Sequence, residues 1–278
     1  MTDYLDRQIG LDEIADAFGE VTFWASRFGA LLLHELPLDP ADTVLDLGCA
    51  TGFPLFELAH MLGPRCRVAG ADVWVRALEH AEQRRRIYRL PNVALAGGDG
   101  AALPFRGGGF GLIVSNLGVN NFAEPEAVLA ECARVLRPGG VLALTTNLAG
   151  HMREVYDVLR AVAHDAGAAG AVGRLAADEA RRGTEVSVED RVRGAGLRVR
   201  RIVRDTFVMR YANGGALLRH WLTRIGFLPS WRAALGADRE RELLAQAERR
   251  LDALATASAH GGLAVTVPML YLEAERPA

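Results

Sequence analysis

The feature that most constrains the fold is an alternation of short apolar runs with longer amphipathic stretches between residues 43 and 147. The apolar runs stop at glycine or polar residues, which is typical of buried strands. The stretches between them have the length and apolar spacing of helices. Strands joined in this way need right-handed helical crossovers, so the order predicts a parallel sheet with helices on both faces. The expected strands are 43–47, 67–72, 93–96, 111–115 and 141–145, the helices are 54–62, 75–88 and 125–135, and a turn is expected over 137–140.

The flanking regions follow other patterns. Residues 5–36 show the apolar spacing of two helices. Residues 197–211 alternate and are rich in β-branched side chains, and residues 263–273 are apolar, so both are expected to be strands. Between these two strands, residues 214–259 are expected to form two or three helices.

The composition excludes several classes of protein. The net charge of −2 gives no general affinity for nucleic acids or acidic membranes. The chain has no lysine, which excludes a P-loop and every enzyme that needs a Schiff-base lysine. The three cysteines form no CxxC pair, so neither a disulfide framework nor a zinc site is expected. With no apolar run of about 18 residues and no signal-peptide pattern, a cytoplasmic protein is expected.

Acidic residues and glycines follow three successive strands at their carboxyl ends. Asp46, Gly48 and Gly52 lie in the turn after the first strand, where glycine permits close approach of a ligand to the backbone. Asp72 ends the second strand, where a carboxylate can accept hydrogen bonds from both hydroxyls of a ribose. Asp99 follows the third strand and can bind an exocyclic adenine amine. The pattern therefore indicates a site for an adenosyl ligand.

A nicotinamide cofactor is the rival ligand, because it uses the same kind of sheet, turn and acid. Its fingerprint G-x-G-x-x-G would need glycine where the chain has Ala50 and Phe53. The carboxylate of Asp46 also suits a cationic sulfonium and ammonium better than a pyrophosphate. These two differences favour the sulfonium ligand.

The chain resembles the class I S-adenosylmethionine-dependent methyltransferases, in particular the small-molecule branch similar to the ubiquinone/menaquinone-biosynthesis type. Four segments in register carry the resemblance: residues 45–52, Asp72, residues 98–105 and residues 134–140. In the first segment Ala50 stands where glycine is commoner. The resemblance implies an α/β fold with a doubly wound, mostly parallel, seven-stranded Rossmann-like sheet whose last strand is antiparallel. It also implies an N-terminal helical lid (1–38), a core (39–211 and 260–278) and a helical cap insertion (212–259).

The resemblance further implies where S-adenosylmethionine binds. The turn at Gly48 and Gly52 would hold the methionine portion and Asp72 the ribose. Val73 and Trp74 would cover the adenine face, while Asp99 and the residues after it would bind the adenine edge. The cofactor-binding residues expected are Asp46, Gly48, Ala50, Gly52, Asp72, Val73, Trp74, Asp99, Gly100, Ala101 and Asn116.

The acceptor side is less defined by the sequence. Residues 115–118 are not the [DN]PP[YF] loop of the enzymes that methylate amino groups of nucleic-acid bases or glutamine. No aspartate ends this strand, so small-molecule acceptors and no metal site are expected. His151 follows the fifth strand and is a candidate general base, unless it is a helix-capping or surface histidine. The pair Asn120 and Asn121 could hydrogen bond an acceptor carbonyl, unless both satisfy turn backbone. Asn147, after the fifth strand, is a further candidate on the acceptor side.

We therefore predict an enzyme that transfers a methyl group from S-adenosylmethionine, by in-line displacement, to an oxygen, carbon or nitrogen of a small metabolite. S-adenosylhomocysteine is the expected product, and a monomer or homodimer without nucleic-acid or membrane partners is expected. One alternative is a cofactor-binding protein of the same fold with a cyclase-like or structural role. The other is a nicotinamide-dependent oxidoreductase.

Overall fold

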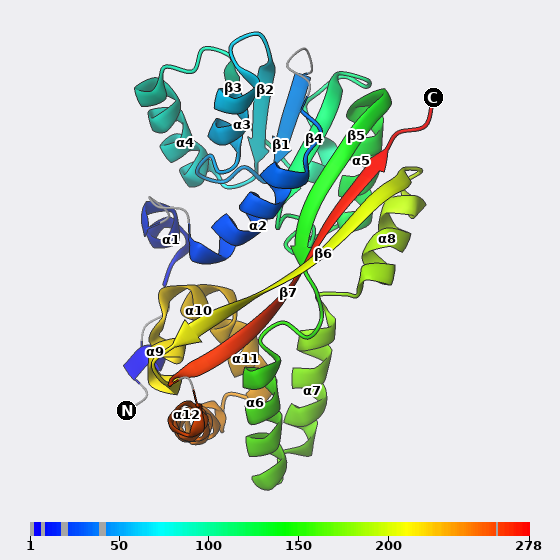
Figure 1. Ribbon diagram of the computed structural model, residues 1–278. Coiled ribbons are helices and arrows are strands. Elements are labelled where there is room, and N and C mark those ends of the chain that lie inside the picture. Colours follow the sequence, from blue (N-terminus) through cyan, green and yellow to red (C-terminus); the bar gives the residue numbers. More distant parts are fainter. Residues whose placement is uncertain (1–2, 7–8, 18–21, 39–42, 260) are drawn as a thin grey trace. The chain divides into compact units, whose positions relative to one another are not determined.

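The computed structural model describes residues 3–6, 9–17, 22–38, 43–259 and 261–278. From residue 43 to residue 147, strands and helices alternate as the apolar runs predict (Figure 1). The elements are β1 Thr43–Leu47, α3 Leu55–Leu62, β2 Arg67–Asp72, α4 Val75–Tyr88, β3 Val93–Gly97, the 3₁₀ helix η2 Gly100–Ala102, β4 Phe110–Asn116, α5 Pro125–Val135 and β5 Leu136–Asn147.

The flanking regions contain further helices and two long strands. They are the 3₁₀ helix η1 Asp3–Leu5, α1 Leu11–Ala17, α2 Phe23–Glu35, α6 Arg153–Asp165, α7 Ala169–Ala180, α8 Glu185–Gly194, β6 Arg198–Tyr211, α9 Gly214–Arg219, α10 Trp221–Gly226, α11 Leu228–Leu235, α12 Glu240–Ala257 and β7 Leu263–Glu275. The prediction of two or three helices after β6 is wrong, because the backbone leaves the helical conformation at His220, Phe227 and Gly236 and divides this region into four.

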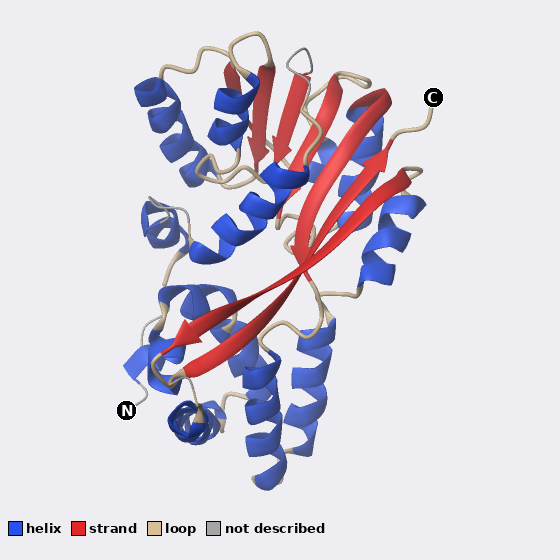
Figure 2. Cartoon of the chain, in the orientation of Figure 1, coloured by secondary structure: helices blue, strands red, loops and turns tan. Residues whose placement is uncertain are grey.

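The described strands form one sheet of seven in the order β3-β2-β1-β4-β5-β7-β6, which Figure 2 shows in red. β1 is parallel to β2 and β4, β2 to β3, and β4 to β5. β7 is antiparallel to β5, with Asn147 opposite Met269. The predicted fold class, a mostly parallel seven-stranded sheet with an antiparallel last strand, is confirmed.

Both faces of the parallel strands are apolar and covered by helices. Alternate residues of a strand point to opposite faces, so Val44 and Leu112 face one side while Leu45 and Leu47 face the other. The first side packs with buried residues of α2, α3 and α4 in one cluster. On the second side, α5 contacts β5, η2 and α8. Such two-sided burial explains why the strands are almost continuously hydrophobic.

Residues 137–140, predicted as a turn, lie within the bounds of β5 but interrupt its regular pairing. Gly139 has a positive φ of 73°, and the pairing with β4 shifts between Phe110–Leu136 and Leu112–Val141, so the chain bulges here. The Gly139 N–H donates to the carbonyl of Arg276 (2.8 Å), and the Arg276 N–H donates to the carbonyl of Gly140 (2.9 Å). A partner so distant in the chain leaves no local signal in the sequence.

The chain divides into two compact units. The sheet unit comprises residues 12–147, 185–205 and 269–278, and the helical unit comprises residues 1–11, 148–184 and 206–268. Within the helical unit, α6 packs against α7 and α12, and α11 packs against α7. Tyr156 and Trp231 are among its fully buried side chains. The division into lid, core and cap stays a prediction.

Candidate functional site

The turn after β1 has the backbone conformation expected of a ligand-binding loop. Gly48, Ala50 and Gly52 all have positive φ, at 80°, 43° and 107°. A side chain at Gly52 would collide with the ring of Phe56, whereas no atom lies within 4 Å of the position a Cβ would take on Gly48. The backbone at Gly48 therefore faces open space. Ala50 adopts the left-handed conformation at a cost of about 1 kcal/mol relative to glycine.

Asp72 joins this turn to the start of α4. Its Oδ2 accepts a hydrogen bond from the Ala50 N–H (2.8 Å), and its Oδ1 accepts one from the Trp74 N–H (2.8 Å). A carboxylate has about four acceptor positions, so two remain for the hydroxyls of a ribose. The side chain is therefore held in place before any ligand binds.

Asp46 lies beneath the turn and is fully buried. Among the described residues, neither carboxylate oxygen has a hydrogen-bond partner. Burial raises the pKa of Asp46 to about 8, and the negative charge of Asp72 adds to this rise. Because a nearby cation would stabilise the ionised form, the site fits a ligand with a positive charge, such as S-adenosylmethionine.

The strand ends that neighbour Asp72 differ in polarity. Val73, directly after β2, leaves 66% of its surface exposed and presents an apolar face suited to a flat ring. Asp99 caps η2, where its Oδ1 accepts a hydrogen bond from the Ala101 N–H (2.9 Å). That amide is therefore engaged by the protein, while Gly100 beside it is buried.

Asn116, at the end of β4, uses both ends of its amide within the protein. Its Oδ1 accepts from the Thr145 hydroxyl (2.8 Å), and its Nδ2 donates to the carbonyl of Ala25 (3.2 Å). The side chain thus ties β4 to β5 and to α2. Its predicted contact with the cofactor stays a prediction.

His151 belongs to the helical unit and is fully buried. Its ring lies 5.5 Å from the ring of Tyr156 and 5.7 Å from that of Phe227, measured between centroids. In the part of the chain that the structure describes, neither ring nitrogen has a hydrogen-bond partner. The alternative of a surface or helix-capping histidine is therefore wrong.

The surroundings of His151 keep its ring neutral. Burial lowers its pKa to about 4, and the positive charge of Arg182 contributes in the same direction. The ring is consequently unprotonated at neutral pH, which is the form a general base needs. The structure thus gathers the predicted cofactor residues and Asn120 at strand ends of the sheet unit, whereas His151 lies in the helical unit.

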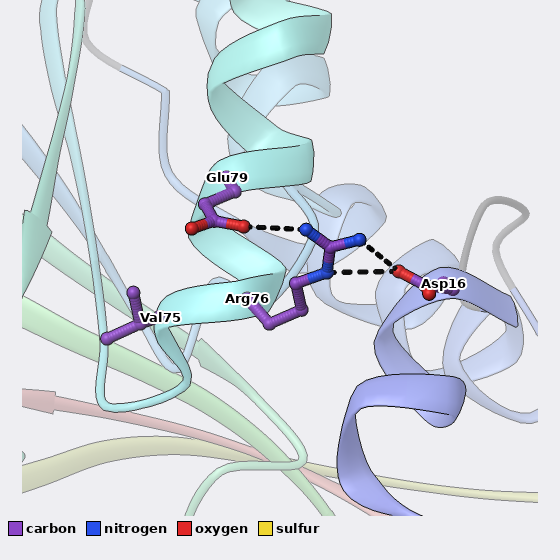
Figure 3. A pocket seen from close by; sticks show the side chains of 4 residues that line it. All are labelled: Asp16, Val75, Arg76 and Glu79. Atoms are coloured by element: carbon purple, nitrogen blue, oxygen red, sulfur yellow. Dashed lines mark hydrogen bonds and ion pairs between the residues drawn. The ribbon is translucent and has the colours of Figure 1, made fainter.

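A recess of about 490 Å³ lies at the first turn of α4, directly after Val73 and Trp74. Figure 3 shows its lining, in which Arg76 bridges Asp16 of α1 and Glu79. His80 also lies 2.9 Å from Asp16. These contacts connect α1 to α4, and no local sequence pattern predicts them.

Neither a metal-binding cluster nor a membrane-spanning helix is present among the residues that the structure describes. No group of three or more His, Cys, Asp or Glu side chains is placed to hold a metal ion. No described helix has both the length and the apolar character needed to cross a membrane.

Comparison with known proteins agrees with this geometry. Residues 38–179 match the model of a family described as "Methyltransferase domain", and the chain belongs to this family. At the level of the family, the match confirms the predicted class of enzyme and the predicted cofactor, S-adenosylmethionine.

Individual relatives extend the comparison. Nocamycin O-methyltransferase of Saccharothrix syringae is 32% identical over 89% of this chain and 90% of its own length. Malonyl-[acyl-carrier protein] O-methyltransferase of Marinomonas sp. (strain MWYL1) is 35% identical over 45% of each chain, so this chain matches under half of that relative. Among solved structures, the [4+2]-cyclase SpnF has a TM-score of 0.55 at 19% identity, covering 91% of this chain and 80% of its own, and shares the fold.

Proposed function

We propose that the protein transfers a methyl group from S-adenosylmethionine to an oxygen, carbon or nitrogen of a small metabolite. One observation carries this proposal: adjacent parallel strands end side by side in Asp46 with its glycine turn and in Asp72, and Asp72 bridges β2 to that turn. Ligands of such sheets bind beyond the carboxyl ends of the strands. The family match supports the same assignment.

Each cofactor residue has a separate task in this proposal. Gly48, Ala50 and Gly52 form the turn that receives the methionine portion, and the buried carboxylate of Asp46 stabilises positive charge. Asp72 binds the ribose. Val73 and Trp74 cover the adenine face, Asp99 with Gly100 and Ala101 binds its edge, and Asn116 holds the neighbouring strand ends in place.

S-adenosylmethionine, when bound, supplies a methyl group on positively charged sulfur. The protein has to orient the acceptor in line with that bond and take up a proton where the nucleophile carries one. We assign the proton to the neutral ring of His151 and the orientation of the acceptor to Asn120. The buried, unpartnered ring nitrogens of His151 support its role.

Turnover to S-adenosylhomocysteine on a panel of small hydroxyl, enol, amine and carboxylic acid compounds tests the proposal. For at least one class of compound, we expect one methylated product for each S-adenosylhomocysteine formed. Tight binding of S-adenosylmethionine with no S-adenosylhomocysteine from any compound would contradict methyl transfer. That result would instead favour a cyclase-like or structural role, which the fold shared with SpnF supports.

Several finer features belong to the same proposal. The enzyme acts in the cytoplasm as a monomer or homodimer, on a free small molecule and without nucleic acid. Residues 1–38 serve as a lid and residues 212–259 as a cap on the acceptor side. Size-exclusion chromatography with light scattering measures the oligomeric state.

A further inference from the structure

Two neighbouring asparagines in the sheet unit carry polar atoms that the protein leaves unused. Asn120 follows β4, and Asn147 is the last residue of β5 and only 3% exposed. The Asn120 Nδ2 donates to the carbonyl of Asn147 (2.8 Å), to the Asn147 Oδ1 (3.1 Å) and to the Thr146 hydroxyl. Three acceptors around one amide nitrogen fix which way both side-chain amides point.

This arrangement leaves one acceptor and one donor without partners. Within the described ranges, the buried Asn120 Oδ1 and the buried Asn147 Nδ2 have no hydrogen-bond partner. Buried polar groups in proteins are almost always paired, because an unpaired one loses its hydration without compensation. Two unpaired atoms of opposite kind, on amides that bond to each other, indicate a common ligand.

The location of the pair agrees with a ligand. Asn116 and Thr145 are paired in the sheet register, so β4 and β5 end together at the edge where parallel sheets bind their ligands. Asn116 and Thr145 use their own polar atoms on each other, as described above. The unpaired atoms belong to Asn120 and Asn147, which follow Asn116 and Thr145 along the chain.

We propose that Asn120 and Asn147 form a donor-acceptor clamp that selects an acceptor with a hydroxyl beside a carbonyl. The Asn147 Nδ2 donates to the carbonyl oxygen, and the Asn120 Oδ1 accepts from the hydroxyl. A carboxylate offers two acceptors and no donor, so it would leave the Asn120 Oδ1 facing negative charge. The inference rests on the proposed function and names its substrate class; both asparagines are positioning residues.

The test uses maltol, a neutral hydroxypyranone with adjacent hydroxyl and carbonyl groups, and the parent pyranone that lacks the hydroxyl. Calorimetry measures the binding of each to the full chain saturated with S-adenosylhomocysteine. We expect maltol to bind about 10-fold more tightly than its parent, as for the loss of one hydrogen bond at a buried polar site. Equal affinities, or no binding of maltol at millimolar concentration, would overturn the clamp.

Asn147→Asp is the decisive variant, because it keeps the oxygen that Asn120 needs and replaces only the unpaired nitrogen. We expect it to weaken maltol binding by about 10-fold or more and to leave the affinity for S-adenosylhomocysteine within about twofold. Asn121→Asp is the matched control, because the exposed side-chain amide of Asn121 donates to the Leu117 carbonyl. Asn147→Ala, checked by its melting temperature, repeats the test without a new charge.

The outcomes separate the two proposals. Unchanged maltol binding in both Asn147 variants would overturn the clamp and assign the unpaired atoms to an ordered water molecule. A wild-type chain that fails to bind S-adenosylhomocysteine would instead contradict the proposed function itself.

Discussion

The turn to which Asp72 bonds and the aromatic rings beside His151 place polar side chains in contrasting surroundings. In the sheet unit, backbone N–H groups already hold the Asp72 carboxylate, and Asp46 beneath it carries a raised pKa. In the helical unit, aromatic rings surround His151, and burial lowers its pKa. The first environment favours a bound cation, and the second favours a neutral base. Cofactor binding, proposed for the sheet unit, and proton transfer, proposed for His151, can therefore be tested independently.

The largest effect should come from the helical unit. His151→Ala removes the proposed base, so turnover should fall by about 100- to 10,000-fold, as for other general bases. Binding of S-adenosylmethionine should stay near that of the wild type. His164→Ala, a change at an exposed histidine of α6, is the control. Added imidazole should restore part of the turnover of His151→Ala; unchanged turnover in this variant would remove His151 from the mechanism.

The converse change lies in the sheet unit. Asp72→Ala removes the carboxylate that bridges the turn and receives the ribose, and hydrogen bonds to a charged group contribute about 1.5–3 kcal/mol each. We expect calorimetry to show affinity for S-adenosylhomocysteine at least about 100-fold weaker. If His151→Ala weakened this affinity as much as Asp72→Ala did, the assignment of cofactor binding to the sheet unit and of proton transfer to His151 would be wrong.

The pH dependence of kcat/KM for the acceptor, measured with saturating cofactor, sharpens the contrast. A general base acts in its neutral form, and the pKa of His151 lies at about 4 instead of the ordinary 6.5. The rate should therefore stay level as the pH falls from 7.5 to about 5. A tenfold loss for each pH unit below 6.5 would show a solvated histidine and contradict the burial argument.

Sequence patterns predicted the sheet unit well, because its strands are short apolar runs bounded by glycine and polar residues. The bounds of β1, β2, α4 and α5 agree with the sequence-based expectations. The hydrogen bonds of Gly139 and Gly140 to Arg276 were not predicted, because Arg276 lies at the far end of the chain. Local patterns carry no information on such pairing.

The candidate site divides in the same way. The turn around Gly48 and the acid Asp72 lie in continuous motifs and could be located by spacing alone. The burial of His151 depends on Phe227, which lies in a different part of the sequence. The sequence places Asn147 on the acceptor side after the fifth strand, but only the structure shows that it bonds to Asn120 and that, among the described residues, its Nδ2 has no partner.

The smallest effect concerns the strained turn. Ala50 has a φ of 43°, a conformation that glycine adopts without steric cost. Ala50→Gly should therefore raise the free energy of unfolding by at most about 1 kcal/mol, since the added freedom of the unfolded chain offsets part of the gain. Cofactor affinity should be unchanged or slightly higher. Chemical denaturation measures the free energy of unfolding. A variant less stable than the wild type would contradict a strained backbone at Ala50.

The most direct test of the adenosyl site is calorimetric titration of the wild-type chain with S-adenosylmethionine and with NAD at pH 7, in buffers of different ionisation enthalpy. Asp46, with a pKa of about 8, is mostly protonated in the free protein and should ionise beside the bound cation. We expect one S-adenosylmethionine to bind per chain and NAD not to bind. Binding should release up to about 0.9 proton, and this release should be absent in Asp46→Asn. Binding of NAD, or no heat with S-adenosylmethionine, would contradict the proposed adenosyl site.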